Sequence, residues 1–321
     1  MARVVVTGRI PSDGLDLLRR HHEVTAWDED RAIPRTELLE FVRNADGLVT
    51  LLTERVDSEL LDAAGPNLKV VANVAVGYNN IDVAACAERG VVATNTPGVL
   101  TEATADTAFA LMLMATRRLG EGERVIRSGT PWQWGMFYLL GSGIQGKVLG
   151  IVGAGAIGIA MARRAKAVGM SVIYTGPAAL APEVEAELGA RRVDFGELLR
   201  TSDVISLHCP YLPETHHLIG RPELAKMKPT AFLINSARGP IIDESALVEA
   251  LRQRQIAGAG LDVFEFEPAV HEGLLDLDNV VLLPHLGSAT IETRTAMAVL
   301  AADNAVAVLA GKPAITAVVG R

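Results

Sequence analysis

Cysteine is scarce in this sequence. Its 321 residues include two cysteines, Cys86 and Cys209, which are too few for a disulfide-stabilised scaffold and lack the spacing of zinc ligands. Long hydrophobic runs are also missing, since no stretch reaches the roughly 18 apolar residues that a membrane-spanning helix needs. Residues 1–8 read as a buried strand rather than a signal peptide. These features predict a protein of the reducing cytoplasm, without a metal site or a membrane partner.

Positive charge is limited too. The 30 basic residues are outnumbered by 38 acidic ones, which gives a net charge of −8, and no block is rich in Lys or Arg. Such a chain is not expected to bind nucleic acid or an anionic membrane. The remaining composition, 49% hydrophobic and 21% charged, is that of an ordinary folded protein. A chain of this length is expected to form two domains.

What the chain does have is a regular alternation of short β-branched runs and helical patterns. In the N-terminal part, strands are expected over residues 3–7, 47–52, 69–74 and 91–94, with helices at 13–20, 35–42, 57–63 and 82–88. Alternation of this kind implies parallel strands with helices on both faces of the sheet. The sequence therefore predicts an α/β fold.

A second series follows a helix predicted over 102–119 and a loop rich in Trp and Gly at 129–146. Its six strands, which would complete one doubly wound domain, are expected over 148–152, 171–174, 204–208, 231–235, 259–262 and 280–283. An Ala-rich helix expected over 289–309 has no strand after it and must bury its apolar face elsewhere, for which the first series is the candidate. The first domain is thus predicted to be discontinuous, residues 1–99 and 287–321, and the second to span 100–286.

The first strand of the second series runs into a glycine-rich loop. Gly153, Gly155 and Gly158 are spaced as Gly-x-Gly-x-x-Gly, and a helical pattern follows. The first glycine permits a tight turn, the second lets the backbone approach a pyrophosphate, and the third lets the helix pack on the strand. The helix N-terminus then offers unpaired N–H groups to the anion. Because strand, loop and helix occur in the required order, the pattern predicts dinucleotide binding.

The end of the next strand bears on which dinucleotide is bound. NAD-selective sites usually place Asp or Glu there for the ribose hydroxyls, but residues 174–179 contain no acid. Without a carboxylate, a 2′-phosphate would meet no repulsion, so the sequence predicts that NADP(H) is favoured and NAD(H) possible. No Arg follows immediately to bind that phosphate; Arg191 and Arg192 are the nearest and lie well downstream.

Three residues able to do chemistry follow strands of the second series. Arg238 comes after the strand at 231–235, Glu267 after the next one, and His285 after the last. Ligands of a doubly wound sheet bind beyond the carboxyl ends of its strands, so these side chains can meet beside a nicotinamide. Reduction of a ketone by hydride needs a proton donor, for which His is suited. A carboxylate on its far nitrogen would fix the tautomer, and Arg would bind a substrate carboxylate.

In this order, these residues resemble the D-isomer-specific 2-hydroxyacid dehydrogenase family over essentially the whole chain. Within that family the chain is most similar to glyoxylate/hydroxypyruvate reductases. Besides the glycine loop, the resemblance rests on residues 73–82, 94–98, 101–106, 207–210 with Thr215, 235–239 and 284–290. It implies a Rossmann dinucleotide-binding domain, a smaller flavodoxin-like substrate domain, a cleft between them, and a homodimer joined through the dinucleotide-binding domains.

The resemblance also implies a role for individual residues. Arg238 would bind the 2-oxo acid, His285 would donate the proton and Glu267 would pair with it, while the N–H groups of Val76 and Gly77 would hold the substrate carboxylate. Ser288 would lie close by. Positions that match the cofactor site, with Asp262 at the nicotinamide amide and Thr104 near its ring, are Thr104, Gly153, Gly155, Ala156, Ile157, Gly158, Thr175, Gly176, Pro210, Thr215, Ser236, Asp262 and Gly287.

Three departures from the family pattern bear on these expectations. Ala156 stands where the family usually has Arg, and Pro177 stands where NADPH-preferring reductases usually have Arg. The loop at 132–143 is short, and Trp134 within it either reaches the partner subunit's active site or anchors the dimer.

The leading hypothesis is reduction of glyoxylate and hydroxypyruvate to glycolate and D-glycerate. A D-lactate-type dehydrogenase acting on another 2-oxo acid is the runner-up, and a dinucleotide-sensing binding protein is a remote alternative. A formate-type enzyme is disfavoured because that branch has Gln in place of Glu267. Four further histidines are expected to make only local hydrogen bonds or to be solvated: His208, His216, His217 and His271.

Overall fold

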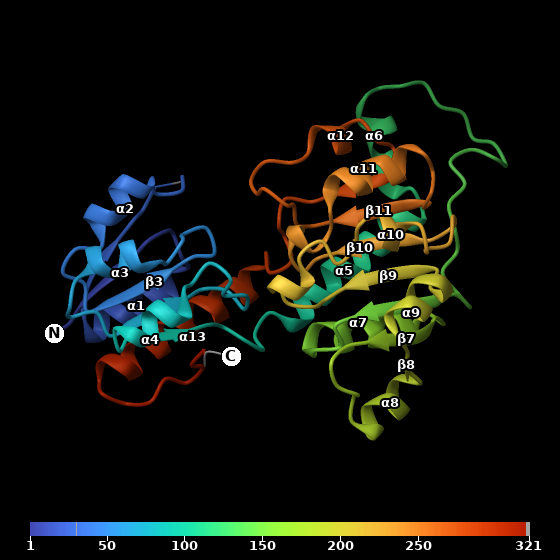
Figure 1. The fold of residues 1–321 in the computed structure, drawn as a ribbon. Helices are drawn as coiled ribbons and strands as arrows, with labels where there is room; N and C mark the ends of the chain where they lie inside the picture. The colour runs from blue at the N-terminus through green and yellow to red at the C-terminus, as the bar shows by residue number, and fades with distance from the viewer. Residues whose placement is uncertain (30, 319–321) are drawn as a thin grey trace. The chain divides into compact units, whose positions relative to one another are not determined.

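The computed structural model describes residues 1–29 and 31–318 and divides the chain into two compact units, shown in Figure 1. Unit 1 comprises Met1–Leu100 and Ser288–Arg321, and unit 2 comprises Thr101–Gly287. Each unit contains one sheet, and within both sheets neighbouring strands run parallel. Both units therefore have the α/β architecture that the sequence predicts.

The sheet of unit 1 has five strands in the order β2-β1-β3-β4-β5, the flavodoxin-like order. Its strands are β1 (Arg3–Val6), β2 (Glu23–Ala26), β3 (Gly47–Thr50), β4 (Val70–Asn73) and β5 (Val92–Thr94). Side chains alternate between its two faces: Val5 belongs to one apolar cluster, and Val4 and Val6 belong to the other. All three are fully buried, so the sheet has a core on each side.

Five helices cover the two faces of this sheet. They are α1 (Ser12–His21), α2 (Arg35–Phe41), α3 (Ser58–Ala64), α4 (Val83–Glu88) and α13 (Ile291–Leu309). α1 and α13 pack on one face, and α2, α3 and α4 pack on the other. Gly14 lets α1 approach α13 closely, because a Cβ at that position would lie 2.9 Å from Ala298. The C-terminal helix, red in Figure 1, thus lies among the blue N-terminal elements of its unit.

The sheet of unit 2 has seven strands in the order β12-β11-β10-β9-β6-β7-β8. This is the Rossmann order, with a further strand beyond the sixth. The strands are β6 (Val148–Val152), β7 (Ser171–Thr175), β8 (Arg191–Arg192), β9 (Val204–Leu207), β10 (Phe232–Asn235), β11 (Gly258–Leu261) and β12 (Val280–Leu282).

Helices cover both faces of this sheet as well. On one side lie α5 (Thr101–Thr116), α7 (Ala156–Ala167) and α8 (Pro182–Leu188). On the other lie α9 (Phe195–Thr201), α10 (Arg221–Leu224), α11 (Glu244–Arg252) and α12 (Glu272–Leu275). The prediction of one helix over 102–119 is wrong at its end: α5 stops at Thr116, and Arg118 takes a left-handed conformation with φ 54° before α6 (Leu119–Arg127) begins.

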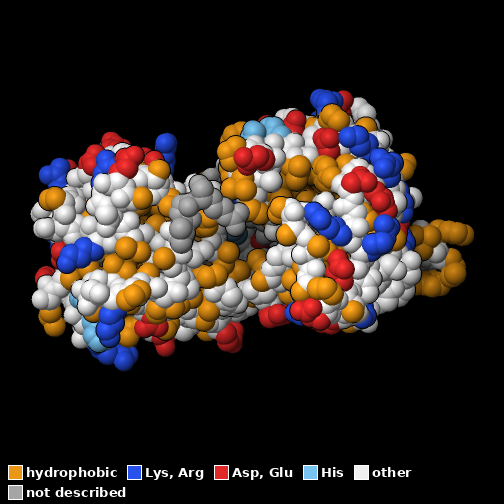
Figure 2. Space-filling view, turned by 60° about the horizontal axis from the view of Figure 1, so that its bottom comes forward, with side chains coloured by type: hydrophobic (Ala, Val, Ile, Leu, Met, Phe, Trp, Pro, Cys, Tyr) orange, Lys and Arg blue, Asp and Glu red, His pale blue; other side chains and the backbone are white. Residues whose placement is uncertain are grey.

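The loop that follows α6 exposes large apolar side chains. Between α6 and β6 the chain forms no helix or strand and projects from its unit as the green segment of Figure 1. Trp132, Trp134, Met136 and Phe137 are 55%, 74%, 71% and 89% exposed. Figure 2 shows hydrophobic side chains gathered at the corresponding outer edge of the unit. Among the described residues, no helix is both long and apolar enough to cross a bilayer.

Candidate active site

Three neighbouring strands of unit 2 deliver the candidate catalytic residues to one edge of the sheet. β10, β11 and β12 are adjacent and parallel. Arg238 lies in the loop after β10, Glu267 in the segment after β11, and His285 in the loop after β12. Because parallel strands end at the same edge, their following loops are neighbours.

Close packing holds the first two of these loops together. A Cβ built on Gly239 would lie 1.8 Å from the carbonyl carbon of Phe264, so only glycine fits there. Asn235, at the buried end of β10, bonds two main-chain groups of the same loop through its side-chain amide, at 2.9 and 3.0 Å. These contacts hold Arg238 beside the segment that contains Glu267.

His285 and Glu267 form a hydrogen-bonded pair. Nδ1 of the imidazole lies 2.7 Å from Oε2 of the carboxylate, and Oε1 accepts a 2.9 Å hydrogen bond from the N–H of Phe264. An ionised carboxylate in this position fixes the hydrogen on Nδ1, which leaves Nε2 for a reactant. The two side chains are 26% and 28% exposed, so a small molecule can reach the pair.

The surroundings keep the pair and Arg238 charged in complementary ways. Burial alone would raise the pKa of Glu267, but its hydrogen bond to His285, the N–H of Phe264 and the charge of Arg238 outweigh burial and hold that pKa below its ordinary value. Burial lowers the pKa of Arg238, and the charge of Glu267 opposes this effect. Glu267 is therefore an anion at neutral pH, close enough to Arg238 to feel its charge.

Asp262 fixes the loop that contains His285. Its Oδ1 accepts a hydrogen bond from the N–H of Leu286 at 2.6 Å and its Oδ2 one from Gly287 at 2.8 Å. Its carbonyl accepts from the N–H of His285 at 2.9 Å, and His285 sits in the left-handed region with φ 53°. Burial raises the pKa of Asp262, against the effect of the two N–H donors. The sequence assigned Asp262 to the nicotinamide and gave no sign that both its oxygens also bind this loop.

The glycine loop between β6 and α7 meets each physical requirement for binding a phosphate. Gly153 has φ 91°, and a Cβ there would lie 2.5 Å from the backbone nitrogen of Cys209. A Cβ on Gly158 would lie 2.4 Å from the carbonyl oxygen of Gly153. Both glycines are therefore needed for packing within the protein.

Gly155 is different, because a Cβ there would meet nothing within 4 Å. It is exposed and begins α7 without a side-chain cap, so the first N–H groups of the helix are open to an anion. Ser236, after β10, has a buried hydroxyl with no hydrogen-bond partner in the part of the chain that is described. An open glycine and an unpartnered hydroxyl at this edge both fit a bound dinucleotide.

The other predicted cofactor residues lie at the same edge of the sheet. Thr104 is buried on α5, in contact range of Gly287, where a Cβ would lie 3.3 Å from the Thr104 methyl group. The hydroxyl of Thr215 closes its own loop by donating to the carbonyl of Pro210 at 2.7 Å. The remaining ones are Ala156 and Ile157 in the first turn of α7, and Thr175 and Gly176 at the end of β7.

In unit 1, the loop after β4 presents two peptide N–H groups. The carbonyl of Val76 accepts a 2.8 Å hydrogen bond from the side chain of Asn95, and the carbonyl of Gly77 accepts one of 3.2 Å from Asn73. Within residues 1–29 and 31–318, the N–H groups of Val76 and Gly77 have no acceptor. Two asparagines thus hold the carbonyls and leave the N–H groups for an anion. Sequence reasoning gave neither a role; a buried Asn at the end of β4 was the available signal.

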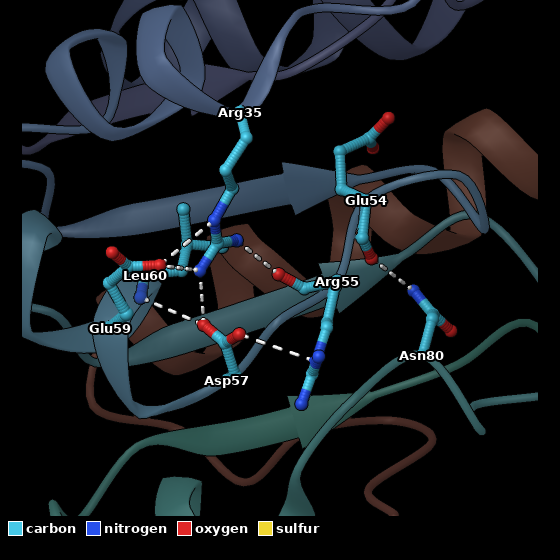
Figure 3. A network of polar contacts seen from close by, with 7 residues as sticks. All are labelled: Arg35, Glu54, Arg55, Asp57, Glu59, Leu60 and Asn80. Atoms are coloured by element: carbon cyan, nitrogen blue, oxygen red, sulfur yellow. Dashed lines mark hydrogen bonds and ion pairs between the residues drawn. The ribbon is translucent and has the colours of Figure 1, made fainter.

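Polar contacts also hold the preceding loop of unit 1, as Figure 3 shows in part. Glu54 is 5% exposed, and its Oε2 accepts from the hydroxyl of Thr7 at 2.7 Å and from the N–H of Leu51 at 2.6 Å. Asn80 donates to the main-chain carbonyl of Glu54 at 3.0 Å, which joins the loops after β3 and β4. In the same view Arg35 joins α2 to α3, the helix that Asp57 caps, through ion pairs with Asp57 and Glu59.

The four histidines outside the pair each make a local hydrogen bond, as predicted. His208 bonds Ser206 at 2.8 Å, and burial lowers the pKa of His208 to about 4. The others bond to Tyr211, Glu265 and the N–H of Gly273, for His216, His217 and His271 respectively. The described residues contain no group of His, Cys, Asp or Glu side chains placed to hold a metal ion.

Taken together, unit 2 offers an imidazole paired with a carboxylate, a nearby guanidinium and an open helix N-terminus at one edge. This set can donate a proton to a carbonyl oxygen, hold an anionic substrate and bind a diphosphate.

Comparison with known proteins gives a consistent result. The family model described as D-isomer specific 2-hydroxyacid dehydrogenase, NAD binding domain, matches residues 109–287. A glyoxylate reductase of Thermococcus litoralis is 51% identical over 315 residues, which cover 97% of this chain and 94% of that protein.

Solved structures agree over the whole chain. A glyoxylate reductase described as from Paecilomyes thermophila superposes with a TM-score of 0.89 at 37% identity, covering 99% of this chain and 98% of that one. An NADPH-dependent glyoxylate/hydroxypyruvate reductase of Sinorhizobium meliloti, in complex with NADP and malonate, superposes with a TM-score of 0.87 at 36% identity, covering 99% and 96%.

Proposed function

Because the chain belongs to the D-isomer-specific 2-hydroxyacid dehydrogenase family, we propose that it reduces glyoxylate to glycolate and hydroxypyruvate to D-glycerate with NAD(P)H. The observation that supports this most directly is the His285–Glu267 pair at 2.7 Å, in electrostatic reach of Arg238. The similarity to reductases named for these two substrates supports the choice of substrate.

The residues divide the work as follows. The dinucleotide, when bound, supplies the hydride. Nε2 of His285 protonates the alkoxide that develops on the substrate, and Glu267 stabilises the imidazolium that His285 is before it gives up the proton. Arg238 binds the substrate carboxylate and polarises the adjacent carbonyl. The N–H groups of Val76 and Gly77, with Ser288, also bind the carboxylate.

We propose that the cofactor is held by the glycine loop and the residues around it. The N–H groups at the start of α7 bind the pyrophosphate, and Gly155 leaves the space for it. Asp262 and Thr104 lie on the nicotinamide side. The other proposed contacts are Gly153, Ala156, Ile157, Gly158, Thr175, Gly176, Pro210, Thr215, Ser236 and Gly287. NADP(H) is favoured, since the residues after β7 contain no acid to repel a 2′-phosphate.

We further propose that the protein is a cytoplasmic homodimer. The exposed apolar side chains of the loop after α6 are the kind of surface that a second copy would cover. Trp134, at 74% exposure, is available to contact that copy, and Trp132 stacks on Tyr138 at 6.4 Å between ring centres. The free thiols Cys86 and Cys209 suit a reducing compartment.

A panel of 2-oxo acids tests the substrate proposal. Glyoxylate, hydroxypyruvate, pyruvate and a bulky aromatic 2-oxo acid are each assayed with NADPH and with NADH. We expect the highest kcat/KM for glyoxylate or hydroxypyruvate, with D-glycerate as the product of the latter. A preference for pyruvate or the bulky acid would instead indicate a D-lactate-type or related dehydrogenase. Dinucleotide binding without turnover of any acid would indicate a dinucleotide-sensing binding protein.

A further inference from the structure

The end of β7 has a cation beside it that comes from another strand. β8 pairs with β7 in parallel, with Arg192 opposite Tyr174. From there, Nη2 of Arg192 donates to the carbonyl oxygen of Gly176 at 2.7 Å and to that of Pro177 at 3.2 Å. A residue well downstream in sequence thus lies against the loop that follows β7.

The charge of Arg192 is not neutralised by the protein. The side chain is exposed, and among residues 1–29 and 31–318 no carboxylate pairs with it. Only Nη2 makes hydrogen bonds to the protein, so Nη1 and Nε keep their hydrogens for a ligand. The loop it contacts, residues 175–182, is uncharged throughout.

The acidic side chains nearby are already engaged. Glu185, on α8, is bonded by the hydroxyl of Tyr174, and Glu187 forms an ion pair with Arg163 at 2.6 Å. The hydroxyl of Tyr174 also accepts the N–H of Leu180 at 2.8 Å, which fixes the far end of the loop. An anion at the end of β7 would therefore meet an ordered loop and one uncompensated guanidinium.

The carboxyl end of the strand that follows the glycine loop is where the adenosine ribose of a dinucleotide lies in this fold. We infer that Arg192 is the residue that recognises the 2′-phosphate of NADP(H), a role that rests on the proposed dinucleotide binding. A planar guanidinium can form two parallel hydrogen bonds to a phosphate. Arg192 thus takes the place of an arginine directly after the strand, where this chain has Pro177.

Arg191 provides a matched control. Neighbouring side chains of a strand point to opposite faces, and Arg191 forms an ion pair with Glu197 of α9 at 2.7 Å. Arg191→Gln removes the same charge from the same strand without touching the loop after β7. Arg192→Lys keeps a charge but loses the planar pair of donors.

Calorimetric titration with 2′,5′-ADP and with 5′-AMP tests the inference without any turnover. We expect Arg192→Gln to weaken binding of 2′,5′-ADP by about 10-fold or more, because a hydrogen bond to a charged group is lost. Binding of 5′-AMP should stay unchanged, Arg192→Lys should restore part of the affinity, and Arg191→Gln should match the wild type. The preference for NADPH over NADH in kcat/KM should fall in parallel.

Other results would overturn the inference. Equal losses for both nucleotides in Arg192→Gln would show that Arg192 only anchors the loop, and unchanged binding of 2′,5′-ADP would show that it has no part in recognition. In either case dinucleotide binding itself would stand. A wild-type protein that binds neither nucleotide would overturn the proposed function and the role of Arg192 together.

Discussion

His285 has one ring nitrogen bonded to Glu267, at 2.7 Å, and one left for a reactant. We expect His285→Ala to lower kcat by at least about 100-fold, the usual contribution of a general acid, while the Kd for NADPH changes little. Steady-state kinetics and calorimetric titration measure the two quantities. His21→Ala, at an exposed histidine of α1, is the control. Near-normal turnover of the His285 variant would remove it from the chemistry.

His208 gives the fold a pH dependence of its own. Its pKa is lowered from 6.5 to about 4 by burial, so between these values the unfolded chain binds a proton there and the folded chain does not. Stability is therefore constant above pH 6.5 and decreases as the pH falls towards 4. His208→Gln should reduce this decrease, by a difference on the order of 1 kcal/mol per pH unit. Urea unfolding of both proteins at several pH values measures it; parallel curves would contradict the prediction.

At the scale of elements, the β6–loop–α7 segment separates glycines needed for folding from one needed for binding. Gly155→Ala places a methyl group where no protein atom lies within 4 Å, so the thermal midpoint should stay near the wild-type value. Dinucleotide affinity should fall about 10-fold or more, because the methyl group would occupy the approach to the pyrophosphate. Thermal unfolding and calorimetry measure the two effects.

Gly153→Ala is the matched comparison. Its new Cβ would lie 2.5 Å from the Cys209 nitrogen at φ 91°, so this variant should lose about 1–3 kcal/mol of stability. If Gly155→Ala instead lowered the thermal midpoint as much and left the affinity intact, Gly155 would be a packing residue.

The elements that the sequence predicts are those with buried strands and amphipathic helices. The runs at 148–152 and 231–235 gave β6 and β10 because their apolar, β-branched residues are fully enclosed. β2 was missed because it is an edge strand whose residues are all partly exposed or exposed. β8 was missed for the same reason, since it consists of two exposed arginines. Edge strands are set by pairing with a neighbour, which a local pattern does not record.

The candidate site shows the same division. Arg238, Glu267 and His285 were found because each follows a recognisable strand, and the ends of parallel strands share an edge. The contacts of Arg192 with the loop after β7, and the two bonds from Asp262 to the loop after β12, were not foreseen. Both depend on tertiary register, because each residue acts on a segment distant in sequence.

For the whole molecule, the exposed apolar loop after α6 predicts the assembly state. We expect the wild-type protein to sediment as a dimer, and the double variant Met136→Ser, Phe137→Ser to sediment as a monomer, because those side chains are 71% and 89% exposed in the single chain. Leu52→Ser, an exposed apolar residue of unit 1, is the control. A monomeric wild type in analytical ultracentrifugation would refute the proposed homodimer.

The left-handed backbone at His285 creates a trade-off between heat resistance and turnover. This conformation costs a residue other than glycine about 1 kcal/mol or more, whereas glycine adopts it freely. Asp262 nevertheless keeps the loop in that conformation from both sides of the imidazole. Selection for thermal tolerance alone would favour a glycine at this position, and selection for rate favours the histidine that stands there.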